Sequence, residues 1–158
     1  MKQATKIGLT FLGLLILIEA IGGLSALLAG DIAAIYADLT KPALSPPAPL
    51  FGIVWPILYG LMALSLTLYI FSTDRREEKK PGLILFIIQL LLNFVWSIIF
   101  FAGGYWIGAA IIIVLDIIVA YLVVRYAASS RWAAIALAPY LIWILFATYL
   151  TFGVAVLN

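Results

Sequence analysis

The chain has 158 residues, of which 66% are hydrophobic and 10% charged, and its mean hydropathy is +1.23. Ordinary globular domains are about 45–50% apolar and about 25% charged, so this composition indicates an integral membrane protein. The net charge of +2 gives no indication of a nucleic-acid partner, and the absence of cysteine and histidine excludes disulfides, metal or haem sites held by those residues, and histidine-based acid–base catalysis.

Five apolar runs are each long enough to cross a hydrocarbon core of about 30 Å, which takes about 20 helical residues. We place them near residues 7–28, 51–71, 82–101, 105–124 and 133–157. Lys2 and Lys6 precede the first run, as in a signal peptide, but its apolar region exceeds the usual length of about 7 to 15 residues. The sequence therefore predicts an all-α membrane protein, a bundle of five transmembrane helices that forms a single domain over residues 1–158.

Small residues recur at every fourth position late in the first run, at Gly22, Ala26 and Gly30. This spacing allows helices to approach closely in lipid. The sequence leaves open whether this face packs inside the bundle or against a second copy of the chain.

The segment between the first two runs, residues 30–50, is rich in proline. Prolines at 42, 46, 47 and 49 remove backbone donors and disfavour helix, so we expect a stiff, extended loop before Phe51. Because it is the only long region where polar and aromatic groups can gather over one end of the bundle, we interpret it as a lid.

Basic residues fix the expected orientation, because Lys and Arg accumulate in cytoplasmic loops. Eight of the nine lie on one side, at positions 2, 6, 75, 76, 79, 80, 125 and 131, and only Lys41 lies on the other. The sequence predicts a cytoplasmic N-terminus, with the lid and the C-terminus extracytoplasmic. We interpret the run Asp74–Lys80 as a solvated loop that anchors two helix ends.

Polar residues inside the apolar runs are the candidates for chemistry, because polar and charged groups are costly in the bilayer. They are Glu19, Gln89, Asn93 and Asp116. At about 1.5 Å of rise per residue, Glu19, Asn93 and Asp116 fall in one layer about 12–16 Å below the lid-side surface. Asn93 is equally consistent with a hydrogen bond between helices and with a contact to a ligand. Glu19 and Asp116 are consistent with a proton relay as an alternative.

Aromatic residues form faces on three of the predicted helices. Helical spacing aligns Trp96 and Phe100 with Gln89 and Asn93 in the third run, and Trp55 with Tyr59 in the second. In the fifth run Tyr140, Trp143 and Ala147 share a face, and Ala147 leaves space that a larger side chain would fill. Pro139 either kinks this helix or follows a separate turn at residues 133–138. The pattern predicts a cavity under the lid that suits a flat, largely apolar ligand. Trp106 and Trp132 stand at helix ends, as interface tryptophans do.

Several short motifs in fixed order resemble one known family. They are Tyr36-x-x-Leu39-x-Lys41-Pro42 with Pro46-Pro47, Phe51-Gly-Ile-Val-Trp55-x-x-Leu58-Tyr59, Leu92-Asn93-x-x-Trp96-Ser97-x-x-Phe100-Phe101, Pro139-Tyr140-Leu141-x-Trp143, and Phe146-Ala147-x-Tyr149-Leu150. Their order in a five-helix chain resembles the tryptophan-rich sensory protein and translocator protein family, also called the peripheral benzodiazepine receptor family.

This resemblance implies a five-helix bundle, commonly a homodimer, that binds porphyrins and related tetrapyrroles and synthetic benzodiazepine-type ligands. It implies a sensory or transport role in a membrane, here expected to be a bacterial plasma membrane, and in some members light-dependent porphyrin breakdown. The resemblance implies no cofactor, because the porphyrin would itself be the ligand or the substrate. The motif positions that line or support the family pocket correspond to Trp55, Asn93, Trp96, Phe100, Trp143, Ala147 and Leu150.

Together these considerations predict a ligand site and its cover. The expected ligand contacts are Trp55, Tyr59, Asn93, Trp96, Phe100, Tyr140, Trp143, Ala147 and Leu150. The expected lid residues are Tyr36, Lys41, Pro42, Pro46 and Pro47. If light-driven chemistry occurs, Trp55 and Trp143 are its candidate redox partners, and a small proton-coupled carrier that uses Glu19 and Asp116 is a further alternative. The family usually has tryptophan where this chain has Ile35 and Leu44.

The predicted orientation can be tested directly because the chain contains no native cysteine. Single cysteines at Ala48 and Glu78 should react with a membrane-impermeant thiol reagent from the outside and the inside of intact cells, respectively. Labelling with the sides reversed would contradict the assignment based on the basic residues.

Overall fold

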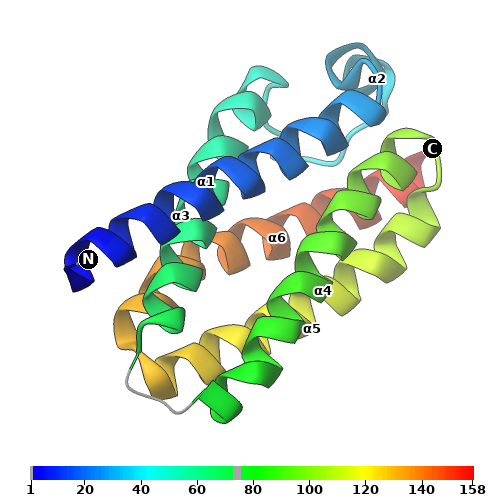
Figure 1. Ribbon diagram of the computed structural model, residues 1–158. Coiled ribbons are helices and arrows are strands. Elements are labelled where there is room, and N and C mark those ends of the chain that lie inside the picture. The colour runs from blue at the N-terminus through cyan, green and yellow to red at the C-terminus, as the bar shows by residue number, and fades with distance from the viewer. Residues whose placement is uncertain (1, 73–75) are drawn as a thin grey trace.

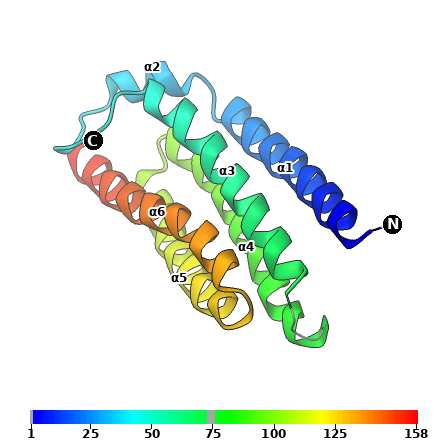
Figure 2. The ribbon, with the colours of Figure 1, turned by 90° about the vertical axis from the view of Figure 1, so that its left-hand side faces the viewer.

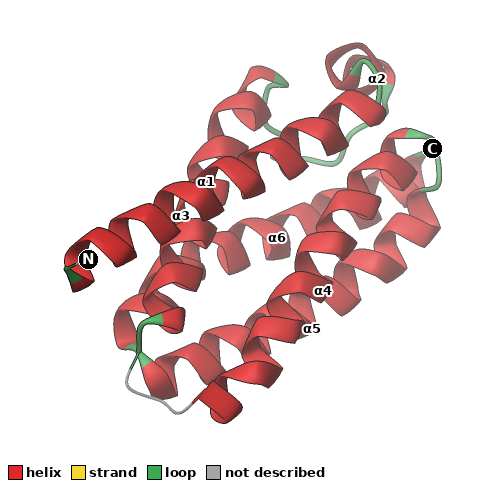
Figure 3. Ribbon diagram, in the orientation of Figure 1, coloured by secondary structure: helices red, strands yellow, loops and turns green. Residues whose placement is uncertain are grey.

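The computed structural model describes residues 2–72 and 76–158, without the side chains of residues 76 and 77. Helices make up nearly all of the described chain (Figures 1 and 3). They are α1 (Gln3–Leu28), α2 (Ile32–Asp38), α3 (Pro49–Ile70), α4 (Arg76–Phe101), α5 (Tyr105–Ser129) and α6 (Arg131–Leu157). Within the described residues, all but α2 are long and apolar enough to cross a membrane. The predicted all-α bundle with five membrane-spanning helices is therefore confirmed.

The five long helices form a ring in an order that differs from their order in the chain. α1 packs on α3 and α4, α6 packs on α3 and α5, and α5 also packs on α4. The ring therefore runs α1–α3–α6–α5–α4 and closes through the contact between α4 and α1. The two chain ends lie at opposite ends of the bundle, as an odd number of crossings requires (Figures 1 and 2). The short helix α2 lies at the same end as the C-terminus.

The helices extend beyond the apolar runs because their ends carry polar residues that hydropathy does not count. α1 begins four residues earlier than expected, and α5 continues to Ser129. The interpretation of residues 74–80 as a loop is wrong for residues 76–80, because α4 begins at Arg76. Asp74 and Arg75 lie outside the described residues. In the first turn of α4, the ammonium group of Lys79 donates to the carbonyls of Ile70 and Ser72 and so caps the end of α3.

α6 runs through Pro139 as one helix from Arg131 to Leu157, so there is no separate turn before this proline. Ser130 caps the start of this helix, because its hydroxyl accepts a hydrogen bond from the backbone N–H of Ala133. Tyr140 and Trp143 therefore keep the spacing of a single helix face.

The lid is only partly the extended loop that the prolines predicted. Residues 32–38 form α2, because the first proline comes only at position 42 and Asp31 caps the helix by accepting a hydrogen bond from the N–H of Ala34. Beyond Asp38 the chain is irregular until Pro49, which occupies the first turn of α3. The lid is thus a short helix followed by a proline-rich strap.

The strap is fastened to the last turns of α6. The backbone of Thr40 and the side-chain amide of Asn158 exchange two hydrogen bonds of 3.0 and 2.9 Å. The hydroxyl of Tyr149 donates to the carbonyl of Ala43 at 2.7 Å. The ring of Pro42 lies so close to Gly153 that a Cβ atom there would approach it to 2.4 Å. The position of the lid therefore depends on the end of α6.

Two predicted lid residues hold the lid together internally. The ammonium group of Lys41 donates to the carbonyls of Tyr36, Ala37 and Leu39 at the end of α2, and it lies 5.0 Å from the centre of the Tyr36 ring. The Tyr36 hydroxyl donates to the carbonyl of Pro46 at 2.9 Å. Burial raises the pKa of Tyr36, so this hydroxyl keeps the proton that it donates.

A buried hydrogen-bonded cluster joins three helices of the ring. The Tyr140 hydroxyl of α6 donates to Gln89 at 2.9 Å and accepts from the amide of Asn93 at 3.2 Å. The Asn93 oxygen accepts from the Tyr59 hydroxyl of α3 at 3.4 Å. All four side chains are buried. We call these residues, Tyr59, Gln89, Asn93 and Tyr140, the floor cluster.

The small residues of α1 pack inside the bundle at one position. A Cβ atom on Gly22 would lie 2.0 Å from the Tyr59 ring, so only glycine allows α1 to approach α3 this closely. Gly23 has no atom near its missing Cβ. At Gly22 the small residues therefore pack inside the bundle, against α3.

The attachment of the lid can be tested with Gly153→Ala. The added methyl group must displace the rigid Pro42 ring, so we expect faster amide hydrogen exchange at Thr40 and its neighbours, measured by mass spectrometry. Gly13→Ala, where nothing lies within 4 Å of the new methyl group, is the matched control. Equal exchange in both variants would show that the strap does not depend on this contact.

Asn93→Leu tests whether the floor cluster stabilises the fold. The Tyr59 hydroxyl would lose its acceptor in a buried position, which costs about 1–3 kcal/mol of unfolding free energy. We expect a lower thermal midpoint in detergent, with the helix content by circular dichroism unchanged at room temperature. An unaltered midpoint would instead favour a role for Asn93 in ligand contact.

Candidate ligand-binding site

Three tryptophans lie one helical turn closer to the lid than the floor cluster. Trp96 follows Asn93 by three positions in α4, and Trp143 follows Tyr140 by three positions in α6. α3 runs in the opposite direction, so Trp55, four positions before Tyr59, also lies on the lid side. We call Trp55, Trp96 and Trp143 the tryptophan layer.

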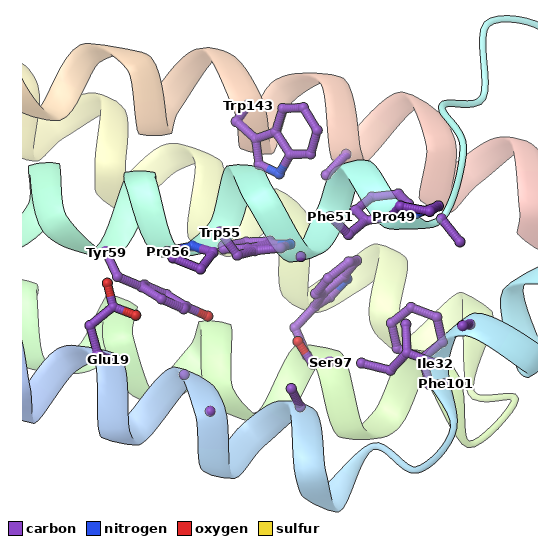
Figure 4. Close-up of a pocket in the computed structure, with 18 residues that line it drawn as sticks. Glu19, Ile32, Pro49, Phe51, Trp55, Pro56, Tyr59, Ser97, Phe101 and Trp143 are labelled. Carbon is purple, nitrogen blue, oxygen red and sulfur yellow. The ribbon is translucent and has the colours of Figure 1, made fainter.

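A cavity of about 450 Å³ opens next to this layer. This is within the range of about 300–1,000 Å³ that is usual for small-molecule pockets. Figure 4 shows the side chains around it, which come from α1, α2, α3, α4 and α6 and the strap. The lining residues are Glu19, Gly22, Gly23, Ala26, Ile32, Ala33, Ala48, Pro49, Phe51, Gly52, Trp55, Pro56, Tyr59, Trp96, Ser97, Phe101, Trp143 and Ala147.

Contacts between rings hold the aromatic wall. Phe51 lies between Tyr36 of the lid and Trp143 of α6, with ring centres 5.1 and 6.0 Å away and both pairs near perpendicular. Trp55 packs against Tyr59 and Tyr140, with ring centres at 5.5 and 6.4 Å. The near-perpendicular contacts of Phe51 fix its ring plane through its edges and through those of its neighbours, which is the arrangement in which ring faces stay available for stacking.

Trp143 carries an unused donor at the cavity. Its indole nitrogen is buried and has no hydrogen-bond partner in the described part of the chain. Figure 4 shows the Trp143 ring with this nitrogen on the side that faces Trp55. A buried N–H without an acceptor is unusual in folded proteins and indicates room for an acceptor from a ligand or a water molecule.

A second, much smaller space of about 30 Å³ lies under the lid on the other side of Phe51 and Trp96. Tyr36 and Ser45 cover it, and Phe100, Leu150 and Thr151 form its base. It shares Phe51, Trp96, Phe101 and Ala147 with the larger cavity.

The structure divides the predicted site residues into three groups. Trp55, Tyr59, Trp96, Trp143 and Ala147 line the larger cavity, and Tyr36, Trp96, Phe100, Ala147 and Leu150 line the smaller one. Asn93 and Tyr140 line neither space and belong to the floor cluster. Lys41, Pro42, Pro46 and Pro47 also lie outside both linings, in the lid.

The wall formed by α1 was not among the predicted ligand contacts. Glu19, Gly22, Gly23 and Ala26 all line the larger cavity. Their spacing of three, one and three positions places them on one helix face, and this was the available signal. By spacing alone, Gly22 and Ala26 belong to a helix-packing stripe and Glu19 to the mid-membrane polar layer, because a single sequence does not say which helix faces α1.

The two acidic residues inside the bundle do not share a site. Asp116 of α5 accepts a hydrogen bond of 2.6 Å from the hydroxyl of Thr148 in α6, and it is not part of either lining. Glu19 lies across the ring, in the cavity wall. The residues at the cavity thus supply stacking surfaces, the indole nitrogens of Trp96 and Trp143, which are buried without a partner among the described residues, and one carboxyl group. Within the described residues, no group of three or more acidic side chains could hold a metal ion.

Comparisons with known proteins show the family of this chain. The profile of the TspO/MBR family matches residues 11–157. The chain is 41% identical over 129 residues to the tryptophan-rich protein TspO of Archaeoglobus fulgidus, with 78% of this chain and 79% of that protein covered. It is 37% identical over 124 residues to the tryptophan-rich protein TspO of Chlorobaculum tepidum, covering 78% of each. It is 36% identical over 122 residues to the human translocator protein, covering 75% of this chain and 72% of that protein. With five membrane-spanning helices and a match over nearly its whole length, this chain is an integral membrane protein that belongs to the TspO/MBR family.

Proposed function

We propose that this protein binds a porphyrin or related tetrapyrrole in the cavity beside the tryptophan layer, in a sensory or transport role. The observation that carries the proposal is the cavity itself, which has aromatic rings from three helices on its walls and a buried, unused indole donor. A flat aromatic molecule can stack on these rings, and a peripheral oxygen on it can accept from Trp143.

The amino acids at the cavity favour a metal-free macrocycle over haem. The sequence contains no histidine or cysteine to serve as an axial ligand. Stacking and apolar enclosure do not depend on a metal. A titration in detergent should therefore show metal-free porphyrin binding at least as tightly as haem.

The biological setting is part of the proposal. Homologues in an archaeon, a bacterium and human, one of them named a translocator protein, support a membrane role that involves movement or detection of a small molecule. A homodimer in a bacterial plasma membrane, with the lid outside, remains the expected arrangement. Benzodiazepine-type ligands would use the same aromatic walls.

Light-dependent porphyrin breakdown is a second candidate, favoured by one observation. Trp55 and Trp143 both line the cavity, so their indoles are placed to exchange electrons with an excited macrocycle. Molecular oxygen would be the oxidant and the porphyrin both chromophore and substrate, while the protein supplies orientation and enclosure.

The third candidate, a proton-coupled carrier, has less support. It requires Glu19 and Asp116 to act along one path, whereas only Glu19 lies at the cavity and Asp116 pairs with Thr148.

Ala147→Phe tests the location of the site. Ala147 lines both spaces, so the new ring would occupy the volume proposed for the ligand, and we expect the affinity for metal-free porphyrin to fall at least about tenfold, a loss of about 1.4 kcal/mol. The measurement is tryptophan fluorescence quenching. Ala110→Phe, on an exposed face of α5, is the control for added bulk. Unchanged affinity in a folded Ala147→Phe variant would place the ligand elsewhere.

Illumination tests the breakdown reaction. Light should bleach the bound porphyrin to a defined product faster than porphyrin in empty micelles, and darkness should stop the reaction. Trp55→Phe and Trp143→Phe should slow the bleaching more than they weaken binding, because phenylalanine still stacks but is a poor electron donor. Trp106→Phe, on the exposed surface, should have no effect. Equal bleaching by the double variant would remove the tryptophans from the mechanism.

A further inference from the structure

The carboxyl group of Glu19 is the one acidic group in the wall of the larger cavity. Figure 4 shows it extending from α1 beside the Tyr59 ring. The Tyr59 hydroxyl does not donate a hydrogen bond to this carboxyl group, because it donates to Asn93. Within the described residues, Glu19 has no hydrogen-bond or ion-pair partner, although it is half-buried at membrane depth.

The helices around Glu19 offer no basic residue that could approach it. The chain has no lysine or arginine between residues 7 and 40 or between residues 42 and 74, and none from residue 81 to residue 124. Lys41 is at the lid, where its ammonium group is bonded to three carbonyls. Among the cavity-lining residues the only other polar side chains are those of Trp55, Tyr59, Trp96, Ser97 and Trp143.

An ionisable side chain at membrane depth is costly unless it faces a cavity and meets a partner. Glu19 meets the first condition, and no described side chain meets the second. A bound molecule with a cationic or N–H donor group at its edge would supply that partner through a charge-assisted hydrogen bond. A molecule with a carboxylate at the same edge would meet a like charge in a poorly screened environment.

We propose that Glu19 sets the charge specificity of the cavity, favouring a flat ligand that carries an ammonium or other N–H donor at the edge facing α1 and disfavouring one that carries a carboxylate there. This inference rests on the proposed function, because it assigns a recognition role within the same cavity. For a natural dicarboxylic porphyrin, it means that the edge without carboxylates lies against α1.

The test uses three probes that share one metal-free macrocycle: protoporphyrin IX, its neutral dimethyl ester, and its bis(2-aminoethyl)amide, which carries two ammonium groups. Each is titrated against the full chain in micelles of an uncharged detergent, with empty micelles as the blank. The wild type should bind the diamine at least about tenfold more tightly than the dicarboxylate, with the ester between them.

Glu19→Gln keeps the shape of the side chain and removes its charge. It should bring the diamine and the dicarboxylate within about threefold of each other, whereas the wild type separates them at least about tenfold. Asp116→Asn is the matched control, because it removes the other carboxyl group of the bundle, which lies outside the cavity lining, and should preserve the wild-type ratio. An unchanged ratio in Glu19→Gln would overturn the inference.

Gly23→Glu is a second variant for the same affinity measurements, and it does not depend on whether Glu19→Gln folds. It adds a second carboxyl group about one turn along the same wall, at a position with nothing within 4 Å of a Cβ atom. It should widen the ratio between diamine and dicarboxylate, and an unchanged ratio would count against the proposal. If the ester binds the wild type no better than it partitions into empty micelles, the proposed function fails and this inference with it. If the ester binds but the ratio of diamine to dicarboxylate affinity is the same in the wild type and in Glu19→Gln, only this inference fails.

Discussion

The hydrogen bonds of the floor cluster are the constraint on which the cavity depends. They connect α3, α4 and α6 at one level, through Tyr59, Asn93 and Tyr140. In an apolar bundle, packing alone does not fix how far each helix is rotated, whereas buried polar groups must meet their partners. Once these three side chains meet, the residues one turn closer to the lid must also face one another. The tryptophan layer is therefore aimed inward by the cluster beneath it.

The lid is held in place by contacts that do not involve the floor cluster. α2 is too short to be stable by itself, and its last carbonyls are satisfied by Lys41 rather than by further helix. The strap then closes onto α6 through Thr40, Ala43 and Pro42. The polar residues of this segment are thus used almost entirely to hold the cover, and the aromatic residues beneath it remain available for a ligand.

The sequence was sufficient for the number and type of the helices and for most of the aromatic wall, because both depend on local spacing and on the cost of polar groups in lipid. It was insufficient for the wall formed by α1 and for the role of Asn93. α1 is apolar almost all round, so its cavity face is marked only by small residues and Glu19, and helix spacing does not say what that face contacts. Asn93 looks the same in sequence whether it meets a ligand or Tyr140, and only the ring order of the helices decides. The prolines of the lid predict an extended chain only from position 42 onward, and the stretch before them, which Asp31 caps, is free to form α2.

The distribution of the five tryptophans has an optical consequence. Trp106 and Trp132 are each 61% exposed at the outer surface of the bundle, whereas the tryptophan layer lines the cavity. The ultraviolet emission of the protein therefore comes from two populations in different surroundings. Brominated lipids would quench the outer pair and a molecule in the cavity would quench the inner three, so a single emission spectrum reports separately on the membrane and on the interior.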